Sequence, residues 1–303
     1  MAINIYRIKK WCKMLAGKSI LHVDQDLGKK ISPGEIKGYY NDLTQKVVKD
    51  CDNLNNPSYI PKFVAESGIE TEFPISIIQY GLGCYDLYLE SNNELYRNKF
   101  FACVEWVLLH QKDNGALDSF LFLYPNAPYS AMCQGEAASL LLRAWRLTDE
   151  EHLLLAAKKA IDFMLLPVCD GGTALYENIG LILLEYTNQP CVLNGWIFAA
   201  FGLYDMSLAM PMAHYRELFS RCVEALKNRL PEFDNGYWSM YDTKGKIASP
   251  FYHGLHIAQL QALYMLTDCD VFKEYANRFD LYKHSFWKSK RAFLKKAIQK
   301  ILE

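Results

Sequence analysis

The sequence predicts an all-α protein, an (α/α) barrel or toroid of repeated helical hairpins with short β-hairpins or loops at one end. Three observations support this fold class. Apolar residues recur at helical spacing from Phe73 onward, strand-like alternation is nearly absent, and glycine-containing turn motifs repeat at intervals of 54 to 64 residues. An open solenoid of helical hairpins is the competing interpretation of the same repeat.

Helices are expected in eight segments of the region 73–303. In each, apolar residues lie three and four positions apart and so share one helix face. The segments are 75–89, 97–110, 135–147, 151–166, 193–209, 215–230, 254–266 and 271–281. A basic helix is expected to follow at the C-terminal end of this domain, and strand-like alternation is confined to brief stretches such as Tyr237–Tyr241.

Residues 1–72 are the least patterned part of the chain. They contain turn-forming residues such as Pro33, Gly34 and Gly38, and one helix is predicted over 41–51. This composition predicts short elements and loops that form an extension packed on the barrel.

Two interleaved turn series define the repeat. Tripeptides of Asp-Asn-Gly or Asp-Gly-Gly begin at Asp113, Asp170 and Asp234. In the second series a polar residue and a glycine stand near the start of an apolar helix, the polar residues being Tyr80, Gln134, Asn194 and His253. Helix N-termini favour anionic groups. The pattern predicts a cavity lined by these four side chains with a preference for carboxylate or sulfate, and the alternative is a set of helix caps without a ligand.

The ends of the chain are basic although the whole chain is nearly neutral. The net charge of −1 argues against nucleic acid as an electrostatic partner. Residues 1–18 carry five Lys and Arg residues and no acid, and residues 283–303 carry seven against Glu303. Such ends are usually solvated faces. Peripheral contact with an anionic membrane is the alternative, because apolar residues intersperse the first run.

The nine cysteines indicate a reducing compartment. Their number is odd, no pair has CxxC spacing, and most lie in apolar runs. The N-terminus lacks the apolar core of a signal peptide, and no uncharged run is long enough to cross a bilayer. We therefore expect a cytoplasmic protein, with the basic ends as its point of contact if it meets the inner face of a membrane.

The stretch Ser239–Gln261 holds the densest set of groups suited to proton transfer. These groups are Tyr241, Asp242, Lys244, Tyr252, His253 and His256. Core residues with one satisfied polar atom each are the alternative. The two histidines are one helical turn apart, a spacing that can bind a metal, but no third ligand is indicated. We expect neither a metal nor a cofactor.

Other polar residues leave rival chemistries open. Glu185 and Tyr186 stand side by side before the Asn194 helix, where they could assist proton transfer or form a solvated loop pair. Ser130 begins a helix near Gln134, but GxSxG is absent, so a serine nucleophile is not indicated. Glycoside hydrolysis needs two carboxylates, and no pair is marked among Asp118, Glu136, Glu185 and Asp242.

Three segments together resemble the C-terminal catalytic domain of D-glucuronyl C5-epimerases. They are PYSAMCQGEAASLLLRAWRLT, CVLNGWIFAAFGLYDM and FYHGLHIAQLQALYMLTDCDVFKEYANRF, and FPISIIQYGLGCYDLYL resembles the segment that opens that region. The similarity covers about residues 73–280 in the same order. It implies an (α/α) barrel that inverts C5 of glucuronate in a heparan sulfate-like or heparosan-like glycan without a redox cofactor.

The resemblance also implies roles for particular residues. The functional tyrosines of the family fall on Tyr186, Tyr241 and Tyr252, with Glu185 beside the first, and would remove and return the C5 proton. The candidates for substrate binding are Lys244, His253, Asn194, Gln134, Tyr80, His256 and Arg143. For Arg143 an outer salt bridge is the alternative. Family members are often dimers, so a homodimer is implied as well.

Departures from the family pattern bear on the substrate. The loop between Tyr241 and Tyr252 is shorter, and Lys244 stands where the family has arginine, which loses bidentate carboxylate recognition. The sequence resembles a compact microbial-type member acting on a polysaccharide or lipid-linked uronate glycan. Two alternatives stay open: a uronate lyase on the same fold, and a non-catalytic glycan-binding barrel.

Overall fold

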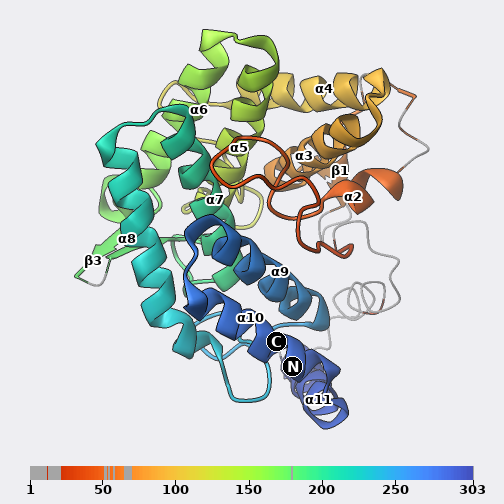
Figure 1. Cartoon of the computed structure of the whole chain (residues 1–303), viewed down its shortest axis with the longest axis vertical. Helices are drawn as coiled ribbons and strands as arrows, with labels where there is room; N and C mark the ends of the chain where they lie inside the picture. Colours follow the sequence, from red (N-terminus) through yellow and green to blue (C-terminus); the bar gives the residue numbers. More distant parts are fainter. Residues whose placement is uncertain are drawn as a thin grey trace.

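The computed structural model describes residue 12 and residues 22–50, 53, 55–56, 59–64, 70–178 and 180–302 of the 303-residue chain. Long helices dominate the described residues and follow one another as hairpins (Figure 1). The four hairpins are α3 (Pro74–Ser91) with α4 (Glu94–His110), α5 (Ala131–Thr148) with α6 (Glu151–Leu165), α7 (Leu193–Ala209) with α8 (Ala213–Arg229), and α9 (Pro250–Thr267) with α10 (Asp270–His284). The predicted all-α fold class is confirmed.

The first helix of each hairpin lies inside and the second lies outside. α3, α5, α7 and α9 pack on one another in this order, and each outer helix packs on its own inner partner. Every residue of α7 from Leu193 to Ser207 is buried. Its partner α8 buries a single stripe at helical spacing, including Leu218, Cys222 and Ala225. The apolar runs in the sequence therefore become the inner ring.

Three inner helices end on a short polar residue in the left-handed conformation. Asn92, Asp149 and Asp268 have φ values of 52°, 58° and 52° and terminate α3, α5 and α9. Asn and Asp tolerate this conformation better than other residues with a side chain. The chain then reverses directly into the outer helix.

Strands are few and short among the described residues. β1 (Lys62–Val64) pairs antiparallel with β2 (Glu70–Glu72), and β3 (Ala174–Glu177) pairs antiparallel with β4 (Gly180–Leu183). Single-turn 3₁₀ helices occur at Val168–Asp170 and Leu230–Phe233. Within Tyr237–Tyr241, Ser239 and Met240 form isolated bridges to Asp234 and Ile247 in place of a strand.

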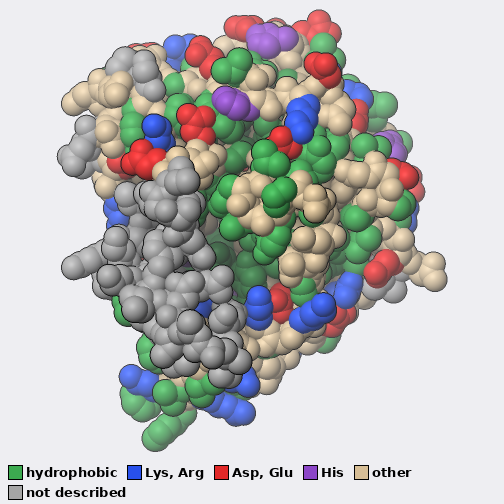
Figure 2. Space-filling model, turned by 180° about the vertical axis from the view of Figure 1, so that it is seen from behind, with side chains coloured by type: hydrophobic (Ala, Val, Ile, Leu, Met, Phe, Trp, Pro, Cys, Tyr) green, Lys and Arg blue, Asp and Glu red, His purple; other side chains and the backbone are tan. Residues whose placement is uncertain are grey.

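The segment before residue 72 packs on the inner ring where it is described. Its helix α2 (Thr44–Val48) packs on α3 and is shorter than the predicted 41–51. The His22 ring meets Phe251 of α9 with ring centroids 5.2 Å apart. This segment therefore spans the space between the first and last inner helices. Figure 2 shows a hollow bordered by hydrophobic side chains on the face of the molecule opposite to Figure 1.

The C-terminal basic segment is helix α11 (Phe286–Leu302), which exposes Trp287 and Leu294 between its lysines. Contact of this end with an anionic membrane stays a prediction. The basic residues of 1–18 lie outside the described residues. In the part of the chain that the structure describes, no helix has the length and apolar character needed to span a bilayer.

Candidate active site

A cavity of about 200 Å³ lies at the N-terminal ends of the inner helices. The inner-helix residues that line it all fall within the first six residues of their helix, including Gln79 of α3, Asn194 of α7 and Tyr252 of α9. The segment before residue 72, the loop at Phe120 and the residues after β4 complete the lining. Because four helix N-termini converge here, the site favours a ligand that carries negative charge.

Glu185 and Tyr186 line one side of this cavity, directly after β4. The preceding residue Leu184 fixes their position, because its carbonyl accepts the N–H of Ala131 at 2.8 Å, at the start of α5. The Tyr186 ring stacks on Phe120 with centroids 4.4 Å apart, and its side chain interacts with the Glu185 carboxyl, an interaction that lowers the pKa of that carboxyl. Burial raises the pKa of Glu185 to about 7, a value suited to a general base.

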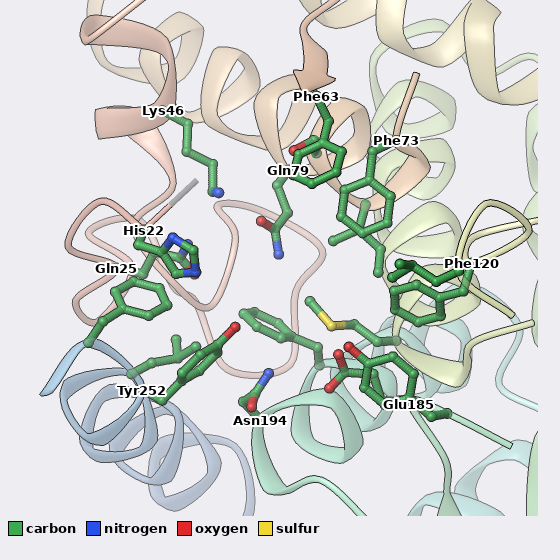
Figure 3. A pocket seen from close by; sticks show the side chains of 18 of the residues that line it. His22, Gln25, Lys46, Phe63, Phe73, Gln79, Phe120, Glu185, Asn194 and Tyr252 are labelled. Atoms are coloured by element: carbon green, nitrogen blue, oxygen red, sulfur yellow. The ribbon is translucent and has the colours of Figure 1, made fainter. Parts of the chain in front are cut away.

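Tyr252 lines the cavity from the first turn of α9. Its N–H donates to Oγ of Ser249, the residue that caps this helix, at 3.3 Å. Figure 3 shows Tyr252 and Glu185 entering the cavity from different sides, with Asn194 between them. Burial raises the pKa of Tyr252 above the ordinary range of a phenol, so this hydroxyl keeps its proton at neutral pH.

Tyr241 links the two sides of the cavity from behind. Its side chain interacts with those of Tyr186 and Tyr252, and its ring centroid is 4.9 Å from that of Tyr252. Its backbone is held on both sides: its N–H donates to the Lys246 carbonyl, and its carbonyl accepts the Leu193 N–H at 3.2 Å. Glu185 and the three predicted tyrosines thus form one cluster of interacting side chains.

The wall facing Asn194 contains residues that sequence patterns did not mark. Lys46 of α2 and Gln79 of α3 project into the cavity there (Figure 3). Gln79 donates to Oε1 of Glu136 at 2.8 Å. A lysine inside the short helix α2 carries no local sequence signal, because only the packing of α2 on α3 brings it to the site.

His253 and His256 lie outside the cavity, contrary to expectation. His253 stacks on Trp238 with centroids 3.6 Å apart, and its Nε2 bonds to the Phe279 carbonyl at 2.9 Å. Both imidazoles bond to the Ser239 hydroxyl through Nδ1, and burial lowers both pKa values to about 3. The pair is a neutral core element that holds the Ser239 loop against α9. Within the described residues, no three His, Cys, Asp or Glu side chains form a cluster suited to a metal.

Four other predicted substrate-binding residues also lie away from the cavity lining. Gln134 donates to the Gly115 carbonyl at 3.2 Å, and Tyr80 is buried with its ring edge-on to that of Tyr59. Lys244 is exposed on its loop. Arg143 is fully buried and pairs with Asp205 at 2.7 Å, so it has no surface to offer a substrate.

The role of Arg143 is to anchor the segment before residue 72. Besides its ion pair with Asp205, it donates to the Gly38 carbonyl at 3.0 Å. The Tyr40 hydroxyl donates to the other oxygen of Asp205 at 2.5 Å. The network therefore ties this segment to α5 and α7.

Sequence comparison matches this chain to the family described as D-glucuronyl C5-epimerase C-terminus over residues 119–281. A D-glucuronyl C5-epimerase of Caenorhabditis elegans is 26% identical over 220 residues, which cover 63% of this chain and 36% of that protein. An uncharacterized protein of Methanocaldococcus jannaschii is 31% identical over 155 residues, 49% of this chain and 50% of that protein. The chain thus matches between about a third and a half of the length of these relatives.

Solved structures share the fold at low sequence identity. A cellobiose 2-epimerase from Spirochaeta thermophila superposes with a TM-score of 0.53 at 11% identity, covering 98% of both chains. An unsaturated glucuronyl hydrolase from Bacillus sp. GL1 gives 0.50 at 13% identity, covering 92% of this chain and 84% of that one. These likenesses establish the helical toroid architecture. The family match spans more than half of this chain and contains Glu185 and all three tyrosines of the cluster, so the protein belongs to the D-glucuronyl C5-epimerase C-terminus family.

Proposed function

We propose that this protein is a uronyl C5-epimerase that inverts C5 of D-glucuronate residues in a polysaccharide or lipid-linked glycan. The observation that carries the proposal is the placement of Glu185 and Tyr252 on different sides of one cavity, joined through Tyr186 and Tyr241. Inversion at carbon needs one group that removes the proton and another that returns a proton to the opposite face. Membership of the epimerase family supports the same activity.

Glu185 is the base and Tyr252 the acid when D-glucuronate is the substrate. The C5 proton is α to a carboxylate and only weakly acidic, so its removal needs a well-placed base whose pKa is near neutrality. Burial brings the pKa of Glu185 to about 7. Tyr252 is protonated and donates its phenolic proton to the other face of C5. In the reverse reaction the two groups exchange roles.

The chain of phenols resets the site after turnover. One inversion leaves a proton on Glu185 and a phenolate at Tyr252. Tyr186 and Tyr241 lie between these two groups, so successive proton transfers from each group to the next return one proton to Tyr252 and free the Glu185 carboxylate. No net proton is gained or lost. Tyr241 is a positioning and relay residue because it does not line the cavity.

Hydrolysis of a glycosidic bond is less well supported by this site. Glycosidases generally use two carboxyl groups that flank the bond. Among the described residues that line the cavity, Glu185 is the only carboxylate. The nearby Glu136 lies behind Gln79, which bonds to it.

The test is hydrogen exchange at C5 in deuterated water with a panel of glucuronate glycans, including heparosan. The expected result is deuterium at C5, detected by NMR, together with iduronate in the product. Absence of exchange across the panel would refute the proposal. Formation of an unsaturated uronate would identify a lyase instead, and tight glycan binding without either product would identify a binding protein.

A further inference from the structure

Lys46 is the one lysine or arginine among the described residues that line the cavity. Its residue surface is only 5% exposed, yet its ammonium group points into the cavity (Figure 3). The same cavity lies at the N-terminal ends of four helices, which also favour negative charge. A cavity with both features is suited to an anionic ligand.

Lys46 is the basic side chain on this wall. Burial lowers its pKa to about 8, and the charge of the neighbouring Glu136 opposes that shift. In turn, burial raises the pKa of Glu136. Its Oε1 already accepts from Gln79. The other titratable groups that line the cavity are His22, Glu185 and the tyrosines.

We propose that Lys46 binds the C6 carboxylate of the uronate residue and stabilises the charge that develops when C5 loses its proton. This inference rests on the proposed function and adds the group that recognises the acid. Figure 3 shows Lys46 and Gln79 across the cavity from Asn194, with Tyr252 and Glu185 entering from different sides of Asn194. A sugar whose C5 lies between Glu185 and Tyr252 can direct its carboxylate to Lys46.

Deprotonation at C5 converts the carboxylate into an enediolate with additional negative charge on its oxygens. A fixed ammonium group at these oxygens stabilises this state more than the ground state, which is the condition for catalysis. Lysine provides a compact point charge in place of the two-pronged contact of arginine.

The proposal makes the segment before residue 72 part of the active site. The family match begins at residue 119, so Lys46 is supplied by sequence outside the matched region. The Arg143–Asp205 ion pair and Tyr40 anchor this segment, and α2 packs on α3, so the position of Lys46 is set by the barrel.

The experiment compares Lys46→Met with Lys37→Met, a substitution of an exposed lysine in the same segment. Binding of a heparosan tetrasaccharide and of its carboxyl-reduced counterpart is measured by calorimetry. Wild-type protein and Lys37→Met should prefer the acidic sugar. Lys46→Met should lose about 10- to 100-fold in affinity for the acidic sugar, the range for a hydrogen bond to a charged group, and bind the reduced sugar unchanged.

Several outcomes would overturn the proposal: an unchanged preference in Lys46→Met, an equal loss for both sugars, or no preference in the wild type. Lys46→Arg keeps the charge and should retain part of the preference. Deuterium exchange at C5 separates this inference from the proposed function. If the wild type exchanges and Lys46→Met exchanges at the full wild-type rate, the role of Lys46 is contradicted and the epimerase proposal stands. Absence of exchange in wild type contradicts the epimerase, while the binding contrast still reports whether Lys46 recognises a carboxylate.

Discussion

The Glu185 carboxyl occupies the space beside Gly195 that a side chain at position 195 would fill. A Cβ atom at position 195 would lie 2.3 Å from Oε2 and 2.5 Å from Cβ of Glu185. Both distances are shorter than any real contact of a methyl group. The third residue pair of the glycine series, Asn194-Gly195, thus serves the site in two ways, because Asn194 lines the cavity and Gly195 leaves room for the proposed base, Glu185.

Gly195→Ala should therefore displace Glu185 and reduce C5 exchange by at least tenfold, since small misplacements of a catalytic group are costly. Gly254→Ala is the matched control, because the new methyl group would meet only Lys283 Nζ at 3.8 Å. The control should keep its activity and gain up to about 1 kcal/mol in stability from the higher helix propensity of alanine. Exchange assays and thermal unfolding of both variants check this, and equal activities would contradict the steric argument.

Glu185→Gln and Tyr252→Phe should each lower C5 exchange by about 10²- to 10⁴-fold, the usual contribution of general acid–base catalysis. Each substitution removes the titrating group and nearly preserves the side-chain volume. The measurement is the initial rate of deuterium incorporation, with circular dichroism as the control for folding. Exchange above a tenth of the wild-type rate in both variants would exclude the assigned roles.

The stability of the protein should depend on pH through Glu185. The folded-state pKa of about 7 lies above the ordinary 4.5, so this group stabilises the fold fully below pH 4.5. The contribution declines as pH rises to 7, by up to about 3 kcal/mol, because the unfolded chain releases the proton first. Glu185→Gln lacks this titration. Its unfolding free energy relative to wild type should rise between pH 4.5 and 8 in urea titrations, whereas a constant difference would contradict the raised pKa.

Tyr40 and Tyr80 should respond differently to loss of their hydroxyl groups. The Tyr40 hydroxyl donates to Asp205, so Tyr40→Phe should destabilise the protein by about 1–3 kcal/mol, as for a hydrogen bond to a charged group. The Tyr80 hydroxyl is buried without a hydrogen-bond partner among the described residues, so Tyr80→Phe should be neutral or stabilising. Melting temperatures of the two variants provide the test, and an equal loss in both would contradict the assignment.

Local sequence patterns predicted the repeated hairpins well because helical periodicity and turn residues act over a few positions. Each of the eight predicted segments corresponds to an observed helix, with ends that differ by a few residues. The family resemblance placed Glu185, Tyr186 and Tyr252 at the site, and they line the cavity. The position of His253 near a helix start predicted that it lines the cavity, but such a position does not determine which way a side chain points. Its ring turns toward Trp238, outside the cavity.

The glycine series illustrates the limit of pattern reasoning. Gly135 and Gly202 are packing residues, because a Cβ at Gly202 would lie 2.2 Å from the Gly135 carbonyl oxygen where α5 and α7 cross. Gly195 makes room for a carboxyl group, and Gly254 meets almost nothing. Glycines in the same local motif are thus required for different structural reasons. Only the residues that surround each glycine in the folded protein distinguish these reasons.

By itself the sequence determined the helical repeat and the end of the toroid where polar residues gather, because both depend on short-range spacing. The tertiary structure decided which groups face one another. Lys46 and Glu185 are about 140 residues apart in the chain and meet across one cavity only because α2 packs on α3 and the strand β4 ends beside α5. Burial, and the pKa values it shifts, arises from that long-range packing and has no counterpart in local sequence.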